Sequence, residues 1–278
     1  MTIETPSGKG AGDENFPVGS FLLPRKLRPH IAKFYAFARA IDDIADNPEL
    51  EPEDKIHRLN AMDVVVQGTP PAGPGLETAV AMHESLQETG TTSQHCSDLV
   101  DAFRQDAVKN RYEDWDGVIE YCLRSASPVG RYLLDIHGES KENYVYADAL
   151  CNALQVINHV QDCGDDYREM DRVYLPEPWL VEKGATVKDL AGSSACPGVR
   201  AVIDRCLEGT RDLLEVAGQL PAHLNSRSLS MESAVILKIA NKLVDELSKR
   251  DPLAERVVLT KPQYASCAIR GIAKGAFS

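Results

Sequence analysis

Y-A-F-A-R-A-I-D-D-I-A-D, residues 35–46, is the stretch of the chain that decides the fold. Its apolar residues recur at helical spacing, and it ends in aspartates. At about 100° per residue, one face of the predicted helix collects four polar side chains. These are Tyr35, Arg39, Asp42 and Asp46. The stretch therefore predicts a packed helix that carries an aligned pair of carboxylates.

The two aligned aspartates lie where their charge is unfavourable. Asp42 and Asp46 are four residues apart, so their Cβ atoms would be roughly 5–6 Å apart. Two ionised carboxylates at this separation repel by about 3 kcal/mol if the effective dielectric is ~20. Pro48 predicts that the helix ends just after them, where the helix dipole favours cations. Because a bound divalent cation would remove both penalties, the pair is a candidate metal site.

The rest of the chain shows the same helical periodicity. It predicts helices at residues 29–46, 52–66, 76–88, 93–110, 115–138, 143–167, 199–219 and 228–249, with a short one starting at Pro176. No alternating β pattern and no internal repeat occurs. The sequence therefore predicts an all-α fold of roughly eight or nine helices in one domain. The predicted loops within that domain are residues 68–75 and 191–198.

One of these predicted helices contains its own break. Asp114 is the predicted N-cap of the helix at 115–138. Ser127, Pro128 and Gly130 lie in its interior and predict a kink that frees backbone groups.

A second acidic cluster lies in Q-V-I-N-H-V-Q-D-C-G-D-D-Y, residues 155–167. Gln155, Asp162 and Asp166 fall within about 40° of one line along the predicted helix, with Asn158 beside them. This line lies opposite an apolar face made by Ala149, Ala153, Val156, Ile157 and Val160. Asp165 is also part of the cluster, and His159 is interpreted as a packing residue.

A single D-x-x-x-D pattern usually marks a solvated acidic face. Here both clusters end strongly apolar helices, and no lysine stands four residues on to form salt-bridged stripes. Together the two clusters favour a metal site. Oxygen ligands without cysteine or clustered histidine select Mg²⁺ or another hard cation over zinc, and Mg²⁺ usually links one or two carboxylates to substrate phosphates. We therefore predict a diphosphate held between two helices.

Composition narrows the class of protein. The net charge of −12, with no long basic run, argues against a nucleic-acid partner. Seven cysteines without a C-x-x-C pattern indicate reduced thiols and a cytoplasmic location. No signal peptide and no apolar run long enough to span a bilayer is present, although peripheral contact with the inner membrane face stays compatible with the sequence. No motif for covalent catalysis occurs.

Taken together, these motifs resemble the squalene/phytoene synthase family. The resemblance covers roughly residues 15–250 and includes L-P-R-K-L-R (23–28), the two aspartate motifs, Y-C-L-R-S-A-S-P-V-G (121–130) and D-R-V-Y-L-P (171–176). It implies an isoprenoid-synthase-type helical bundle around a central cavity, formed by residues 15–278 after a flexible tail at 1–14. It also implies a Mg²⁺-dependent reaction of a prenyl diphosphate, with other enzymes of squalene synthesis as partners.

The resemblance assigns roles to individual residues. The metal-contacting positions would be Asp42, Asp46, Asn158, Asp162 and Asp166. The catalytic positions would be Asp42, Asp46, Asp162, Asp166 and Tyr35. The prenyl diphosphate would contact Asn15, Tyr35, Arg39, Tyr121, Gln155, Gln161, Arg172 and Tyr174.

Two departures from the family pattern bear on the reaction. Gln161 stands where many condensing members carry Arg, and Ser127-Pro128 replaces Gly-Thr. With N-F-P-V-G-S and D-C-G-D-D-Y, Gln161 resembles the bacterial hydroxysqualene synthase branch, which is linked to hopanoids. This implies that presqualene diphosphate loses diphosphate and that water captures the rearranged cation. The alternatives are condensation of two prenyl diphosphates, as in presqualene diphosphate or phytoene synthases, and a non-catalytic helical protein that binds cations or a partner.

Overall fold

The computed structural model describes residues 3–6 and 22–276, and this part of the chain forms helices and no strands. The α-helices are α1 (Arg28–Ala45), α2 (Pro52–Val66), α3 (Glu77–Thr89), α4 (Gln94–Asp106), α5 (Trp115–Ser125), α6 (Ser127–His137), α7 (Tyr144–Gln161), α8 (Cys163–Met170), α9 (Glu177–Glu182), α10 (Pro197–Ala217), α11 (Leu220–His223), α12 (Arg227–Leu247) and α13 (Lys261–Ala276). Two 3₁₀ helices are η1 (Lys141–Asn143) and η2 (Val187–Ala191). The predicted all-α single domain is confirmed.

The helix boundaries follow local sequence signals. Proline stands in the first turn of α1, α2, α6 and α10, where its missing N–H is not needed. Asp114 caps α5 as predicted, since its Oδ1 accepts a hydrogen bond from the Gly117 N–H at 2.8 Å. The predicted kink is a complete break, because Ala126 leaves the helical conformation between α5 and α6.

The predicted helix at 143–167 is wrong in one respect. It ends at Gln161, and Asp162 is the junction at which α8 begins. The hydrogen-bond ladder nearly continues, since the Asp166 N–H donates to the Asp162 carbonyl at 2.8 Å. The prediction for the end of the chain was also incomplete. Helix α13 follows α12, and the sequence analysis predicted no helix there.

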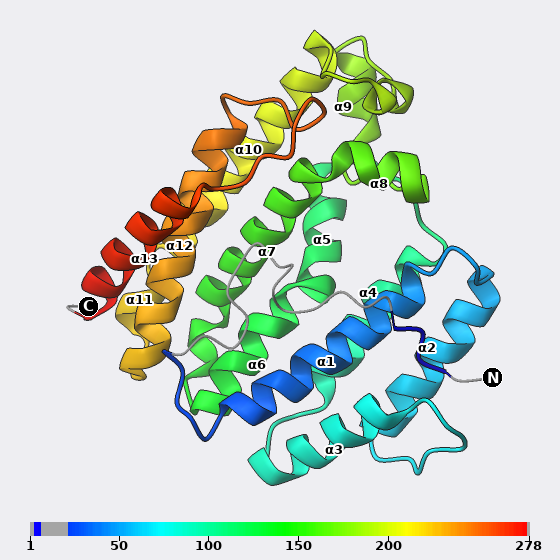
Figure 1. Ribbon diagram of the computed structural model, residues 1–278, viewed down its shortest axis with the longest axis vertical. Helices are drawn as coiled ribbons and strands as arrows, with labels where there is room; N and C mark the ends of the chain where they lie inside the picture. The colour runs from blue at the N-terminus through cyan, green and yellow to red at the C-terminus, as the bar shows by residue number, and fades with distance from the viewer. Residues whose placement is uncertain (1–2, 7–21, 277–278) are drawn as a thin grey trace.

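Figure 1 shows how these helices are arranged. Helix α1 lies opposite α7, and α5 and α6 lie between them. Helix α8 turns aside at the end of α7. On its other side α7 packs against α10 and α12, and α12 packs against α13. The ends of α1 and α7 that carry the aspartates are thus brought to the same side of the bundle.

Helices α12 and α13 pack backbone against backbone. A Cβ on Gly271 would lie 2.4 Å from Val235 Cα, and one on Gly275 would lie 2.6 Å from Met231 Cα. Only glycine allows this close approach, so the spacing of the two glycines sets how α13 covers α12.

The predicted tail at 1–14 falls mainly outside the described residues. Residues 3–6 lie against the bundle, where Glu4 accepts hydrogen bonds from Thr78 and the Thr5 hydroxyl donates to the Asp43 carbonyl. The division into tail and domain stays a prediction. Within the described part, none of the helices combines the length and apolarity needed to cross a bilayer.

Candidate functional site

A cavity of about 420 Å³ opens between the aspartate-bearing ends of α1 and α7. It is lined by Tyr35, Ala38, Arg39, Asp42, Asp46, Phe103, Asp106, Tyr121, Ser125, Val129, Gln155, Asn158, His159, Asp162, Asp166, Met170, Arg172 and Tyr174. Helices α1, α4, α5, α6, α7 and α8 and the segment after α8 all contribute.

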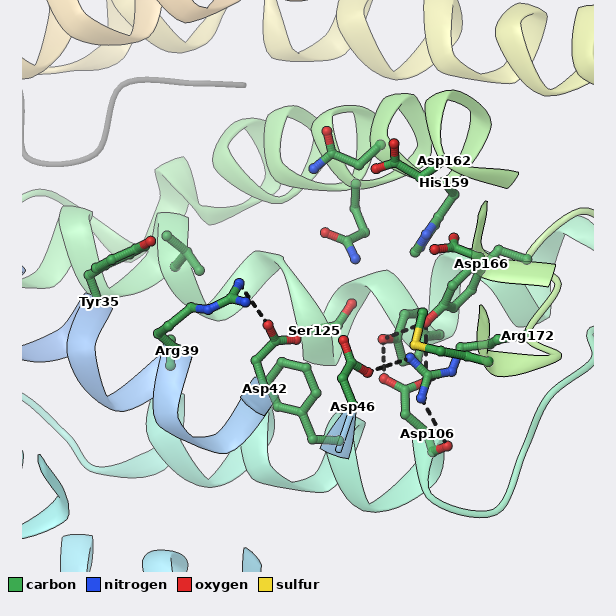
Figure 2. Close-up of a pocket in the computed structure, with 18 residues that line it drawn as sticks. Tyr35, Arg39, Asp42, Asp46, Asp106, Ser125, His159, Asp162, Asp166 and Arg172 are labelled. Atoms are coloured by element: carbon green, nitrogen blue, oxygen red, sulfur yellow. Dashed lines mark hydrogen bonds and ion pairs between the residues drawn. The ribbon is translucent and has the colours of Figure 1, made fainter. Parts of the chain in front are cut away.

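Two walls of this cavity carry carboxylates that face each other. Asp42 and Asp46 project from α1, and Asp162 lies on the opposite wall at the end of α7 (Figure 2). Asp166, one turn into α8, stands at the side of the cavity between them. The two clusters predicted from sequence therefore belong to one site.

Arginines partly balance these carboxylates. On α1, Arg39 Nη1 lies 2.9 Å from Asp42 Oδ2, and Nη2 lies 3.1 Å from Asp43 Oδ1. From the segment after α8, Arg172 Nη1 donates to Asp46 Oδ1 at 2.9 Å, linking the two walls. Both guanidinium groups line the cavity, so they lie where they could also contact an anion.

Burial and repulsion by neighbouring carboxylates raise the pKa values of Asp42 and Asp166. Burial, with the charge of Asp46 added, raises the pKa of Asp42 to about 8. Burial and the charge of Asp162 raise the pKa of Asp166 to about 8 as well. The arginines thus do not compensate the acidic groups fully, and a cation between the walls would let them ionise.

A buried hydrogen-bonded group supports the floor of the cavity. Asp106, at the end of α4, accepts a hydrogen bond from the Tyr121 hydroxyl at 2.5 Å and one from the Tyr174 hydroxyl at 3.4 Å. Burial raises the pKa of Asp106 to about 6, partly offset by Arg172. The His159 ring stacks on Tyr174 with 3.5 Å between centroids, and burial lowers its pKa to about 3, so the imidazole is neutral.

These contacts add residues that sequence reasoning missed. Asp106 belongs to none of the sequence motifs. His159 was interpreted as a packing residue, and it both packs in the interior and lines the cavity. Ser125, at the break between α5 and α6, also lines it, and no described residue forms a hydrogen bond with its buried Oγ. The motif at residues 121–130 and the predicted break at Ser127-Pro128 were the available signals for Ser125.

The family model described as squalene/phytoene synthase matches residues 10–263. The chain belongs to the squalene/phytoene synthase family. Among curated members, it is 43% identical to a hydroxysqualene synthase of Zymomonas mobilis over 98% of this chain and 91% of the relative. It is 43% identical to a hydroxysqualene synthase of Rhodopseudomonas palustris (94% and 88% covered) and 31% identical to a phytoene synthase of Mycobacterium tuberculosis (80% and 73% covered).

Solved structures agree with this membership. The chain superposes on squalene synthase HpnC from Alicyclobacillus acidocaldarius with a TM-score of 0.71 and 28% identity, covering 82% of this chain and 85% of that one. A dehydrosqualene synthase with bound ligand gives a TM-score of 0.76 at 19% identity (94% and 92% covered), which shows the shared fold. The isoprenoid-synthase-type bundle implied by the resemblance is confirmed.

Most of the predicted site residues of this family member line the one cavity. They are Tyr35, Arg39, Asp42, Asp46, Tyr121, Gln155, Asn158, Asp162, Asp166, Arg172 and Tyr174. Asn15 lies outside the described residues. Asp165 is exposed, forms an ion pair with Arg168 and does not line the cavity.

Gln161 requires a correction. It is buried, and its Nε2 donates to the Val257 carbonyl at 2.6 Å, toward the segment between α12 and α13. It does not line the cavity, because it precedes Asp162 by one residue and its side chain is therefore turned about 100° from that of Asp162. The structure therefore does not bring Gln161 to the other predicted substrate-binding residues.

The donor set fits a hard divalent cation. Asp42, Asp46, Asn158, Asp162 and Asp166 present only oxygen ligands, apart from the amide NH₂ of Asn158. Among residues 3–6 and 22–276, no three His, Cys, Asp or Glu side chains approach closely enough to hold a metal by themselves. A cation at this site would take further ligand atoms from substrate phosphates or from water, as Mg²⁺ usually does.

A second cavity, of about 190 Å³, continues the site along α7. Its α7 residues are Ala147, Leu150, Cys151 and Leu154, whereas the first cavity takes Gln155, Asn158, His159 and Asp162. Val129 lines both cavities. One helix thus lines a polar cavity with its C-terminal half and an apolar cavity with the half before it.

Proposed function

We propose that this protein converts presqualene diphosphate and water into hydroxysqualene and diphosphate in a Mg²⁺-dependent reaction. The observation that carries the proposal is a pair of neighbouring cavities that share Val129, with oxygen ligands on facing walls of the first and mainly apolar side chains around the second. A molecule with a diphosphate head and long hydrocarbon chains matches both. The names of relatives 39–43% identical over most of the chain support the same reaction.

The head of the substrate would bind between α1 and α7. Arg39 and Arg172, already placed beside Asp42 and Asp46, would donate hydrogen bonds to diphosphate oxygens. Bound Mg²⁺ would neutralise the leaving diphosphate, so that no acidic side chain is needed to release it. Asp42, Asp46, Asn158, Asp162 and Asp166 are proposed to hold that metal.

The reaction then balances without a redox cofactor. The C–O bond to the diphosphate breaks, and the diphosphate leaves with the electron pair. The remaining cyclopropylcarbinyl cation rearranges, and a water oxygen forms the new C–O bond while the water loses a proton. The apolar second cavity would keep bulk water from the cation, so that capture occurs at one position.

We prefer water capture to condensation because the more similar relatives are named hydroxysqualene synthases. The hydroxysqualene synthases are 39–43% identical, whereas the phytoene synthases are 31% identical or less among those compared. Gln161 no longer supports this choice, because its amide points to Val257 and away from the cavity.

Product analysis tests the proposal. Purified protein with Mg²⁺ is given presqualene, farnesyl or geranylgeranyl diphosphate in separate reactions, and diphosphate and lipid products are measured. We expect hydroxysqualene from presqualene diphosphate. Presqualene diphosphate or phytoene formed from the shorter substrates would establish condensation instead. Metal binding without diphosphate release from any substrate would establish a non-catalytic cation-binding protein.

A further inference from the structure

Ser125 brings a hydroxyl group without a hydrogen-bond partner to the wall of the first cavity. It is the last residue of α5, directly before the break at Ala126, and it lines the cavity. Its Oγ is buried and forms no hydrogen bond with any described residue. Because a buried hydroxyl without a partner costs free energy, stability alone does not account for a serine at this position.

A second serine at the same break provides the contrast. Ser127 is the first residue of α6 and is fully buried. Its Oγ donates a hydrogen bond to Asn152 Oδ1 on α7 at 2.9 Å, and it lines neither the first nor the second cavity. Of the two hydroxyl groups, the one at residue 127 is therefore used within the fold, and the one at residue 125 is left for a molecule in the cavity.

Ser125 lies between the groups that would hold diphosphate and the start of the apolar cavity. Figure 2 shows it between Tyr35 on one side and Asp166 and Arg172 on the other. Val129, four residues further along the chain, lines both cavities and so marks their boundary. The carbon that loses the diphosphate would lie in this region, since the head of the substrate would stay between the carboxylates and its hydrocarbon would continue past Val129.

His159 carries the other uncharged buried atom of this kind in the cavity lining. Its Nε2 has no hydrogen-bond partner among the described residues. However, its ring stacks on Tyr174, and Figure 2 shows it on the same side of the cavity as Asp166 and Arg172. It therefore lies with the groups proposed to hold the diphosphate, whereas Ser125 lies toward the hydrocarbon.

A hydroxyl group suits a water molecule beside a cation. When substrate is bound, the carboxylates would hold metal and the guanidinium groups would hold diphosphate oxygens. The Ser125 hydroxyl can accept and donate a hydrogen bond, so it can hold water without a charge of its own. The residue is only partly buried, and a turn about its Cα–Cβ bond to another staggered position moves Oγ along the cavity wall.

We propose that the Ser125 hydroxyl holds the water molecule that captures the cation; this inference rests on the proposed function. The water donates a hydrogen bond to Oγ, and its oxygen forms the C–O bond to the rearranged cation. One O–H bond of the water breaks, and the proton passes to the diphosphate released in the same cavity. The serine orients the water and neither gains nor loses a proton overall.

Substitution of the two serines separates ionisation from capture. Ser125→Ala removes the hydroxyl, and Ser125→Cys keeps the size of the side chain but leaves a weak hydrogen-bonding group. Ser127→Ala is the matched control, because it removes a hydroxyl at the same break that does not face the cavity. Each variant receives presqualene diphosphate and Mg²⁺ in ¹⁸O-water, and diphosphate release, labelled products and Tm are measured.

For Ser125→Ala we expect diphosphate release within about threefold of the parent and a fall of about fivefold or more in hydroxysqualene formed per diphosphate, since one hydrogen bond to the water is lost. The balance would appear as hydrocarbons formed by proton loss and as other ¹⁸O-labelled alcohols. Ser125→Cys would give an intermediate fraction. Tm of Ser125→Ala would equal or exceed that of the parent, because no bond within the protein is broken.

The control should behave in the opposite way. Ser127→Ala leaves Asn152 Oδ1 without this donor, so Tm should fall by about 2–4 °C while hydroxysqualene formed per diphosphate stays at the parental value. An equal change of that ratio in Ser127→Ala and Ser125→Ala would overturn the proposal, because the break as a whole would then set the product.

An unchanged ratio of hydroxysqualene to diphosphate in Ser125→Ala would also overturn the assignment. So would a clear loss of stability in that variant, because the hydroxyl would then have a partner within the protein. If Ser125→Ala does not fold, an unchanged ratio in Ser125→Cys leads to the same rejection. The parent protein tests the proposed function separately: if the parent forms no hydroxysqualene, the function itself is rejected.

Discussion

The two halves of the cavity-lining face of α7 differ sharply, although they belong to one continuous helix. Its C-terminal half presents Gln155 and Asn158 to the first cavity, with Asp162 directly after its end, whereas its preceding half presents aliphatic side chains such as Leu150 and Leu154 to the second cavity. The change from apolar to polar lining residues falls between Leu154 and Gln155. A substrate that fits both halves must be charged at one end and hydrocarbon at the other, and substitutions in each half should affect different properties.

The largest effect is expected in the polar half. Replacing Asp162 or its counterpart Asp46 by Asn should lower turnover of presqualene diphosphate roughly a thousand-fold, equivalent to about 4 kcal/mol, because a metal-supporting charge is lost. Far-ultraviolet circular dichroism should show unchanged helix content. Asp165→Asn is the control, since Asp165 belongs to the same motif but lies outside the cavity. Unaltered turnover in Asp46→Asn and Asp162→Asn would refute the role of the facing carboxylates.

Filling the apolar half should give a smaller effect of another kind. Leu154→Phe adds volume to the second cavity, so kcat/KM for presqualene diphosphate should fall about 10- to 100-fold, or roughly 1.4–2.7 kcal/mol. Binding of inorganic diphosphate with Mg²⁺, measured by calorimetry, should stay within twofold of the parent. Val145→Phe serves as the control because Val145 is exposed on the same helix. If diphosphate binding fell together with kcat/KM, the two halves would not act separately.

A pH dependence of stability should belong to the polar half. The folded-state pKa values of Asp42 and Asp166 are raised to about 8, so these groups hold more protons in the folded than in the unfolded chain between about pH 4 and pH 8. They therefore lower the free energy of unfolding as pH rises through this window. Without metal, Tm should fall from pH 6 to pH 8.5. Asp42→Asn should flatten this dependence, and an equal slope in that variant would contradict the assignment.

The same pKa values predict proton release on metal binding. Mg²⁺ with diphosphate should raise Tm more at pH 8.5 than at pH 6, since the ligands bind as carboxylates. Calorimetry at pH 7 in two buffers of different ionisation enthalpy should register the released protons. Heats independent of the buffer would show that the carboxylates were already ionised.

The smallest effect is expected at Gln161, beside the polar half but outside it. Gln161→Met removes the hydrogen bond to the Val257 carbonyl and leaves that oxygen without this donor, which should cost about 1–2 kcal/mol of stability. Because the amide does not line the cavity, kcat/KM should change less than twofold. Urea denaturation and steady-state kinetics measure the two quantities. A tenfold rise of KM for presqualene diphosphate in this variant would show that Gln161 contributes to substrate binding.

The sequence predicted the parts of this site that depend on local spacing. Asp42 and Asp46 are one helical turn apart on α1, and their common face required only the helical period. The facing position of Asp162 followed from a second pattern of the same kind. Asp106 could not be found in this way, because it reaches the cavity from the end of α4 by the packing of helices distant in sequence.

Breaks in helices and close contacts between helices also could not be predicted from local sequence patterns. The junction at Asp162 interrupts a periodicity that continues in sequence, and Gly164 is the nearby sign, since a Cβ there would lie 2.7 Å from Leu253 Cδ2. No helix was predicted for α13, and its close contact with α12 depends on Gly271 and Gly275, which belong to no pattern that a single segment reveals. Gln161 was misplaced because its neighbours in the motif line the cavity while its own side chain faces Val257.

The ion pair between Arg172 and Asp46 joins positions 126 residues apart. Closing so long a loop costs conformational entropy before the contact can form, so this link depends on the helices between having packed first. During synthesis at about 5–20 residues per second, the end of α1 emerges roughly 6–25 s before Arg172 and the end of α6 roughly 2–7 s before it. A nascent or truncated chain that ends before α7 has the first carboxylates but no opposing wall. The candidate site is therefore completed only after Arg172 has reached the packed helices.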